Sequence, residues 1–398
     1  MNTSTTSPKL ASEWLALVAV CLAAVIVNAD VALKPLLLAS YIEFLNFDTE
    51  HAAYLIAIEA GATAVATALT AAFINRLDRR RTMVLALVLI GIANGFSLFS
   101  GSFTLLAGAR SLAGLAHGLG LAIVAASIAS FRQPDRAAGV MTMAASLAGT
   151  IMMFAIPQAQ ATFGVSSIFW VMGALILPPL IFIRALPRRA EIGDGVTTSA
   201  APTQSASLLR PLVLISLLVA GFFYLSVGAF GPFSAQLGRN AGLLYQQTGE
   251  VLALAGVASM LGAVTAITVG DRFGRVAPIL LSIIGASTAL SALLIAPQSK
   301  AAFLLAVPAF FFCWASVYPY LMGFASRLDP SGRVNGLFFT LSLAGFAAGP
   351  AIGGMLTSFA STTQQGLAYV VLFSLICLIP ALGFAPIVKT RDKSPPPP

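Results

Sequence analysis

Five ionisable residues stand inside long apolar segments in the first half of the chain: Asp30, Lys34, Glu59, Arg110 and His117. A charge near the centre of a bilayer costs about 2.5–3.5 kcal/mol on insertion scales, so each of these residues is a candidate functional residue. With a helical rise of about 1.5 Å per residue, Asp30 and Glu59 are expected at similar depths. Lys34 and Arg110 are expected somewhat shallower, and His117 nearest the middle. The spacing therefore predicts one layer of two anions and two cations beside an imidazole.

These residue types fit proton-coupled chemistry. Apolar surroundings disfavour an ionised carboxylate, whereas a neighbouring Arg or Lys favours it. If Glu59 faces Arg110, or Asp30 faces Lys34, a change of partner makes protonation depend on conformation. His117 is a candidate proton relay, or else a hydrogen-bonded contact between helices. The alternative for the whole layer is a static salt-bridge cluster that only holds three helices together.

The segments that carry these residues are long enough to cross a membrane. Hydrophobic residues make up 58% of the chain and charged residues 9%, against roughly 25% charged in a soluble protein. Crossing the hydrocarbon takes about 20 apolar residues, and backbone groups in lipid must bond within their own segment. The sequence therefore predicts an all-α membrane protein with twelve transmembrane helices, at residues 13–40, 50–74, 82–101, 104–130, 137–160, 165–186, 211–237, 248–270, 276–296, 300–326, 334–358 and 366–388.

The basic residues predict the orientation of these helices. Of the 22 Lys and Arg residues, 18 lie in the tails or in the turns after even-numbered segments. Because basic residues of short loops stay on the cytoplasmic side, both termini are predicted to be cytoplasmic, in a plasma (inner) membrane of bacterial type. The net charge of +8 is thus a topology signal and not a basic stripe, so no nucleic-acid partner is expected.

The halves of the chain repeat each other with an offset of 196 positions. Asp271-Arg272-Phe273-Gly274-Arg275 corresponds to Asn75-Arg76-Leu77-Asp78-Arg79, and Ser342-Leu343-Ala344-Gly345 repeats Ser146-Leu147-Ala148-Gly149. Between the halves, residues 187–210 read as a flexible polar linker. The predicted organisation is a cytoplasmic tail 1–12, a six-helix bundle 13–186, the linker 187–210, a second bundle 211–388 and a tail 389–398. Parallel apolar halves of this kind are typical of secondary transporters.

With these motifs the chain resembles the major facilitator superfamily, whose signature between the second and third helices is Gly-x-x-x-Asp-Arg-x-Gly-Arg-Arg/Lys. The second copy matches the core of this signature, and the first departs from it at Asn75 and Asp78. Arg110-Ser111-Leu112-Ala113-Gly114 resembles the Arg-x-x-x-Gly motif of proton-coupled members. Gly349-Pro350-Ala351-Ile352-Gly353-Gly354 resembles the antiporter motif, but it stands in the eleventh segment instead of the fifth. The fifth segment is nearer to the proton-coupled drug and sugar efflux permease branch. The resemblance implies two six-helix bundles related by pseudo-twofold symmetry.

The repeated turns are predicted to close the cytoplasmic side. Asp78 and Asp271 can accept hydrogen bonds from helix N-termini or from arginines of the opposite half. The alternative is that the arginines only set the topology. The predicted gate residues are Asn75, Arg76, Asp78, Arg79, Asp271, Arg272, Gly274 and Arg275.

The second half supplies aromatic residues where the first supplies charges. Tyr and Trp away from the membrane interfaces need a polar partner, so they are candidates for a cavity wall, although many aromatic residues must face lipid or neighbouring helices. The predicted substrate-cavity residues are Asn28, Tyr224, Phe230, Trp314, Tyr318 and Phe338.

No enzyme constellation, nucleotide loop, metal-ligand spacing or cofactor motif is found in the sequence. Two buried cations and an aromatic half favour proton symport of a small organic anion, such as an aromatic one, by a monomeric carrier. Proton-antiport efflux of drugs or amphipathic metabolites is the first alternative. A non-transporting membrane sensor with a carrier fold is the second, and the short cytoplasmic segments argue against it.

Overall fold

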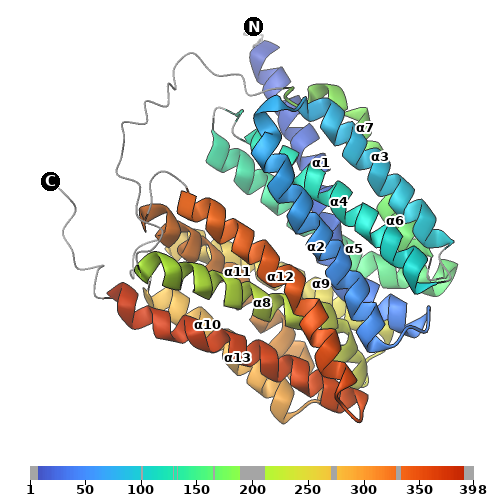
Figure 1. Ribbon diagram of the computed structural model, residues 1–398, viewed down its shortest axis with the longest axis vertical. Helices are drawn as coiled ribbons and strands as arrows, with labels where there is room; N and C mark the ends of the chain where they lie inside the picture. The colour runs from blue at the N-terminus through green and yellow to red at the C-terminus, as the bar shows by residue number, and fades with distance from the viewer. Residues whose placement is uncertain are drawn as a thin grey trace, which may run out of the picture. The chain divides into compact units, whose positions relative to one another are not determined.

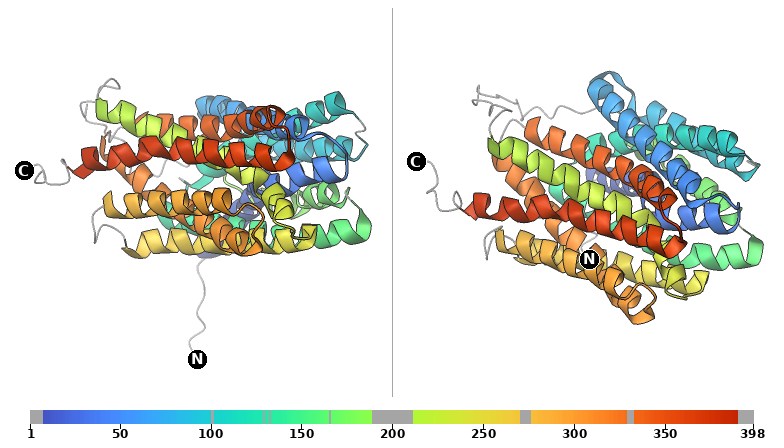
Figure 2. Two further views of the ribbon diagram at one scale, coloured as in Figure 1. Left: turned by 90° about the horizontal axis from the view of Figure 1, so that it is seen from below. Right: turned by 60° about the horizontal axis from the view of Figure 1, so that its bottom comes forward.

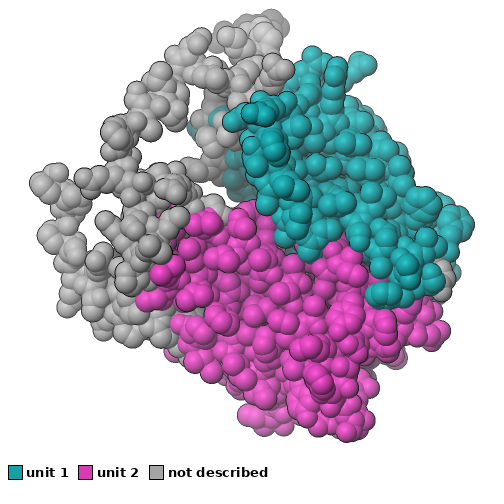
Figure 3. Space-filling model, in the orientation of Figure 1, with its two compact units in different colours: residues 1–33, 61–199 teal, residues 34–60, 200–398 magenta. Residues whose placement is uncertain are grey.

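The computed structural model describes residues 8–99, 102–128, 130–131, 133–164, 166–188, 211–269, 276–328 and 333–389, and these residues are almost entirely helical. The predicted all-α membrane fold is confirmed, because eleven of the helices in this part of the chain are long and apolar enough to cross a bilayer. The chain divides into two compact units, which Figure 3 colours separately. Unit 1 comprises residues 1–33 and 61–199, and unit 2 comprises residues 34–60 and 200–398.

Within each half, the helices follow one another along the chain with few residues between them (Figure 1). The first half contains α1 (Pro8–Glu43), α2 (Thr49–Phe73), η1 (Ile74–Arg76), α3 (Arg79–Leu98), α4 (Phe103–Ile128), α5 (Pro134–Phe163), α6 (Ser167–Ala174), α7 (Leu177–Ile181) and η2 (Ile183–Ala185). The second half contains α8 (Pro211–Asn240), α9 (Tyr245–Val269), α10 (Val276–Ile295), α11 (Lys300–Leu328), α12 (Arg333–Ser358) and α13 (Thr363–Lys389). The unit boundary crosses α1 after Leu33 and α2 after Ala60, so these two continuous helices contribute to both units.

The sixth expected segment, 165–186, is not one helix. It forms α6, α7 and the short 3-10 turn η2. Pro178 and Pro179 stand at the start of α7, where they remove two successive backbone donors. Because neither proline can donate to the carbonyl oxygens of Ala174 and Leu175, α6 ends at Ala174 and the chain restarts as α7. The long helices contain prolines as well, but none of them has two in succession within the described residues.

The repeated Ser-Leu-Ala-Gly motif has a packing role in both halves. In unit 1, a Cβ on Gly149 of α5 would lie 3.0 Å from the Cβ of Ala32 on α1. In unit 2, a Cβ on Gly345 of α12 would lie 2.4 Å from the backbone oxygen of Gly221 on α8. The same motif therefore brings equivalent helix pairs into close contact, as the internal repeat predicts.

In unit 2, α8 and α12 run side by side and touch through their backbones (Figure 2). A Cβ on Gly349 would meet the carbonyl carbon of Gly228 at 2.2 Å, and one on Gly228 would meet the oxygen of Phe346 at 2.4 Å. Small residues at such crossings allow apolar helices to associate in lipid by close packing. Gly349 of the antiporter-like motif thus serves the α8–α12 contact.

Gly349→Ala is expected to destabilise the protein by about 1–3 kcal/mol, because overpacking a close contact moves backbone as well as side chains. Thermal unfolding of the purified protein in detergent measures the effect. Gly231→Ala is the matched control, since nothing lies within 4 Å of its added Cβ and alanine favours a helix. Equal unfolding midpoints for the two variants would contradict the assigned contact.

Candidate functional site

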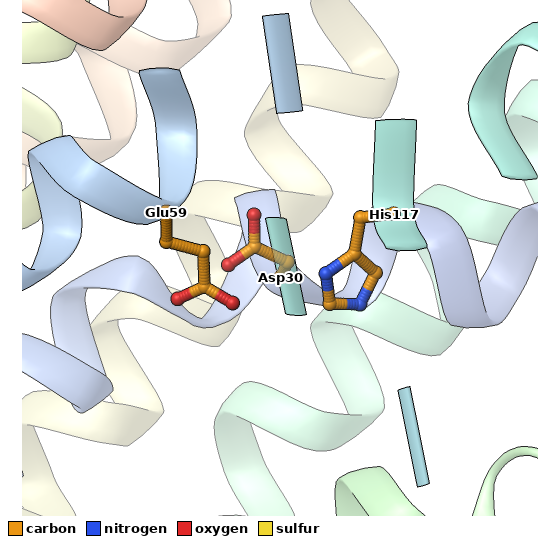
Figure 4. Close-up of side chains that lie close together, drawn as sticks. All are labelled: Asp30, Glu59 and His117. Carbon is orange, nitrogen blue, oxygen red and sulfur yellow. The ribbon is translucent and has the colours of Figure 1, made fainter. Parts of the chain in front are cut away.

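Three of the predicted charge-layer residues form one compact group. Asp30 and Glu59 each offer a carboxylate oxygen and His117 offers a ring nitrogen. These three atoms all lie within 4.8 Å of one another (Figure 4). The exposed fractions of the three residues are 1%, 0% and 0%. Two carboxylates this close in an apolar interior cannot both stay ionised without a compensating cation or proton. The group can therefore hold a proton, and two oxygens with an imidazole nitrogen are also a donor set that a divalent transition metal accepts.

Two glycines of α4 place His117 beside the other two residues. A Cβ on Gly118 would lie 2.4 Å from the backbone oxygen of Thr63 on α2, one turn after Glu59. A Cβ on Gly120 would lie 2.4 Å from the Cγ1 of Val27 on α1, less than one turn before Asp30. Because α4 lies against both helices at this level, the imidazole of His117 reaches the depth of both carboxylates.

Lys34 lies one helical turn after Asp30 on α1 and is 1% exposed. Residues four apart lie on the same face of a helix, so the predicted shared face is preserved in the continuous α1. Asn28 stands on the same helix, and its side-chain amide donates to the backbone oxygen of Ala24 at 2.8 Å.

Arg110 is fully buried in unit 1, where it joins α3, α4 and α6. Its Nη2 donates to Oγ of Ser97 at 2.7 Å, to Oδ1 of Asn94 at 3.0 Å and to the backbone oxygen of Ala93 at 3.4 Å. Its guanidinium carbon lies 5.2 Å from the centre of the Phe169 ring, within the range of a cation–π contact. The planar group is thus held in a fixed orientation by neutral acceptors and an aromatic face.

The predicted cavity residues of the second half form two aromatic groups within unit 2. The ring of Tyr318 on α11 lies 5.9 Å from Tyr224 on α8 and 6.4 Å from Phe338 on α12. Phe230 packs against Phe310 at 4.5 Å and is fully buried, as is Phe338. Trp314, Tyr224 and Tyr318 keep part of their surface exposed.

Trp314 has a polar atom available for a ligand. Its indole Nε1 is buried and has no hydrogen-bond partner among the residues that the structure describes. A buried indole N–H normally finds an acceptor. A bound solute with an acceptor oxygen would supply one.

The first copy of the gate motif makes its recorded contacts inside unit 1. Asp78 caps α3 by accepting a hydrogen bond from the backbone nitrogen of Arg81 at 3.0 Å. This bond, helped by the positive charges of Arg188 and Arg81, lowers the pKa of Asp78 below its usual value. Arg79 donates to Oγ of Ser130 at 2.8 Å, and its backbone nitrogen donates to the oxygen of Arg188 at 3.2 Å.

The other gate predictions remain predictions. Asn75 and Arg76 lie exposed within the η1 turn. Asp271, Arg272, Gly274 and Arg275 of the second copy lie outside the described residues.

Unit 2 contains a group of contacts between residues 36–44 and the segment where α8 ends and α9 begins. Nε of Arg239 lies 2.9 Å from Oε1 of Glu43 in an ion pair. The Tyr245 hydroxyl is 3.2 Å from Oγ of Ser40 and donates to the backbone oxygen of Leu36 at 3.3 Å, while its ring packs edge-on against Phe44. These contacts join the end of α1 to the end of α8 and the start of α9.

Sequence reasoning missed the partners that hold Arg110. Asn94 and Ser97 are polar residues three apart in an otherwise apolar segment, and that spacing places them on one helical face. This signal was present in the sequence, but it does not say which arginine the face meets.

Comparison with known proteins shows the family of this chain. The sequence profile of the Major Facilitator Superfamily matches residues 15–350. A probable sugar efflux transporter of Mannheimia succiniciproducens is 24% identical over 276 residues, which is 67% of this chain and 66% of that protein, so the matched part is just under two thirds of the relative's length. A chloramphenicol efflux pump of Mycobacterium tuberculosis is 26% identical over 321 residues, 75% of this chain and 76% of that protein.

Solved transporter structures share the fold at low sequence identity. A nucleoside transporter superposes with a TM-score of 0.77 at 12% identity, covering 94% of this chain and 98% of that one. A D-xylose–proton symporter gives 0.75 at 14% identity, covering 95% and 97%. A bacterial homologue of the human lysosomal transporter Spinster gives 0.73 at 15% identity over 100% of both chains.

Proposed function

Because the chain belongs to the Major Facilitator Superfamily, we propose that it is a proton-coupled secondary carrier which moves a small organic solute by alternating access. The observation that carries the proposal is the buried group of Asp30, Glu59 and His117 within membrane-spanning helices. Family and fold indicate a multi-pass membrane transporter rather than an enzyme. We place it in a bacterial-type plasma membrane as a monomer with both termini cytoplasmic and no cofactor.

Proton coupling follows from the chemistry of this group. Two carboxylates and an imidazole within 4.8 Å share one or more protons when they are sealed from water. Opening one side of the carrier hydrates the group and favours ionisation, whereas closing that side reverses the preference. The protonation state thereby becomes linked to conformation, which is what coupling requires.

The contacts at the end of α1 support alternating access. In unit 2, the Arg239–Glu43 ion pair and the Tyr245–Ser40 contact tie α1 to α8 and α9. A carrier that opens at this end must break both contacts. Each is an exposed or partly buried polar interaction, so the cost is small enough for a reversible cycle.

For the direction of transport, we favour export by proton antiport. Both curated relatives are named as efflux proteins, one for sugars and one for chloramphenicol. This choice reverses the order of preference that the sequence alone gives.

Proton symport of an aromatic organic anion is the second candidate. The guanidinium of Arg110, buried beside Asn94, Ser97 and Phe169, is a planar cation within the membrane-spanning helices, and planar cations bind carboxylates well. The paired rings of Tyr224 and Tyr318 would suit an aromatic solute.

Substrate-driven proton flux in proteoliposomes tests these proposals. Vesicles that contain a pH-sensitive dye are given a gradient of chloramphenicol, glucose or benzoate in turn. Antiport predicts that protons move against the solute flow, and symport predicts that they move with it. A protein that binds a probe but moves neither solute nor protons would be a sensor, and that result would overturn the carrier proposal.

A further inference from the structure

A polar pocket of about 340 Å³ lies in unit 2, and Asp30, Glu59 and His117 are not among the residues that line it. Its wall combines the start of α2 (Asp48, Thr49, Glu50), Gln236 of α8, the end of α12, the turn 360–362 and the start of α13. We call it the hydroxyl pocket, because Thr and Ser residues dominate this wall. Its volume is at the lower end of the range for small-molecule sites, and more than ten times the roughly 30 Å³ that one water occupies.

Two hydroxyl groups and one carboxylate of the hydroxyl pocket present acceptor oxygens. The hydroxyl groups of Thr357 and Ser358 donate to their own helix at the backbone oxygens of Gly354 and Met355, 2.6 and 2.8 Å away. Their oxygen lone pairs are left for a ligand. Glu50 keeps one carboxylate oxygen beyond the one that accepts from the Tyr54 hydroxyl at 2.7 Å. A ligand with several N–H or O–H donors would complement this wall.

The charge of the wall favours a cation. Asp48 and Glu50 are the acidic residues among those lining the pocket, and none of the lining residues is Lys or Arg. Asp48 also caps α2, since Oδ1 accepts from the backbone nitrogen of His51 at 2.7 Å, and the His51 ring lies against the same carboxylate. Glu50 is therefore the carboxylate best placed for a ligand.

The side-chain amide nitrogen of Gln236 needs a hydrogen-bond acceptor. Gln236 is only 8% exposed, it lines the pocket, and its amide nitrogen has no hydrogen-bond partner in the described part of the chain. A buried N–H without an acceptor costs about 1–3 kcal/mol. A bare metal ion would leave this nitrogen unpartnered, whereas a hydroxyl oxygen of an organic ligand can accept from it.

We propose that the hydroxyl pocket is a binding site for a small polyhydroxylated cation, such as a protonated amino sugar. Its hydroxyl and ammonium donors meet the carboxylate of Glu50 and the oxygens of Thr357 and Ser358, and one of its oxygens accepts from Gln236. The proposal does not rest on the proton-coupled transport function, because all of these residues lie in unit 2 and outside the charged group.

Three probes with the same sugar ring separate charge from shape: glucosamine, glucose and glucuronate. Ala360 lines the pocket without a polar side chain, so Ala360→Cys reports occupancy through its rate of reaction with a maleimide. The natural cysteines, Cys21, Cys313 and Cys377, are first replaced by Ala. The assay uses the purified full chain in detergent at about pH 6. Glucosamine is protonated there, because the pKa of an amine of the α-amino type is about 7.7–8.0.

Glucosamine is expected to slow the reaction at a concentration at least about fivefold lower than glucose, and glucuronate is expected to give no protection. Glu50→Gln keeps the oxygen that accepts from Tyr54 and should remove the preference for glucosamine over glucose. Gln236→Leu should weaken protection by both sugars. Glu250→Gln is the matched control, because Glu250 is an exposed carboxylate of α9 that does not line the pocket.

Protection by glucuronate equal to that by glucosamine would overturn the proposal. So would an absence of protection by all three probes, or a Glu50→Gln variant that behaves like Glu250→Gln. An Asp30→Asn chain should retain glucosamine protection, so a failure of the transport proposal is distinguishable from a failure of this one.

Discussion

Glu59→Gln and Asp30→Asn, each made singly, are expected to abolish proton-driven accumulation of the transported solute in at least one case. Exchange of labelled for unlabelled solute should continue, because exchange needs no net proton movement. Each variant keeps the shape of its side chain but removes the ionisable oxygen from the buried group with His117. Without that oxygen, the protonation of the site no longer changes with conformation.

The size of this effect follows from burial. Asp30 and Glu59 are at most 1% exposed. Replacing a solvated carboxylate by an amide changes transport little, because water can accept and donate protons in its place. Water cannot replace a buried carboxylate that carries the coupling proton. In the variant that loses the coupling proton, the expected loss is therefore complete for accumulation and small for exchange.

Paired uptake and counterflow measurements in proteoliposomes check this prediction, with the solute that proves active in the flux assay. Glu250→Gln is the control, because it removes an exposed carboxylate from α9 without touching the buried group. Concentrative transport at normal levels by both the Glu59→Gln and the Asp30→Asn protein would end the coupling proposal.

Arg110→Lys is expected to weaken binding of aromatic carboxylates at least about tenfold if the carrier takes an organic anion. A hydrogen bond to a charged group contributes about 1.5–3 kcal/mol, and each 1.4 kcal/mol is about a factor of ten in affinity. Lysine keeps the charge but loses the planar fork that Asn94, Ser97 and Phe169 hold in place. Arg110→Ala should also lower the unfolding temperature, because three hydrogen bonds in unit 1 disappear.

A thermal-shift screen of the purified protein tests this prediction by comparing the rise in unfolding temperature that aromatic carboxylates and lipophilic cations produce. Arg184→Lys is the matched control, since Arg184 is exposed in the η2 turn and is not one of the predicted gate residues. Stabilisation by cations alone, with Arg110→Lys indistinguishable from Arg184→Lys, would reject the organic-anion alternative and leave Arg110 as a packing residue.

The sequence by itself determined the fold class and the membrane setting. Apolar runs of about 20 residues have one stable form in lipid, so their number and length are sufficient to predict the helices. The exception was the segment 165–186, where the paired Pro178 and Pro179 broke an apolar run into α6 and α7. Buried charges such as Asp30, Glu59 and Arg110 were also identifiable from sequence, because a charge in an apolar run is costly wherever the helix is placed.

Only the tertiary structure decided which of these residues meet. Helical depth predicted a layer, but rotation about each helix axis depends on contacts such as Gly118 with Thr63 and Gly120 with Val27. Those contacts brought His117 to Asp30 and Glu59, and they turned Arg110 toward Asn94 and Ser97. The hydroxyl pocket was likewise invisible in the sequence, because Glu50, Gln236 and Thr357 are far apart along the chain. Hydrophobicity acts locally and can be read from a segment, whereas side-chain juxtaposition is set by the packing of several helices at once.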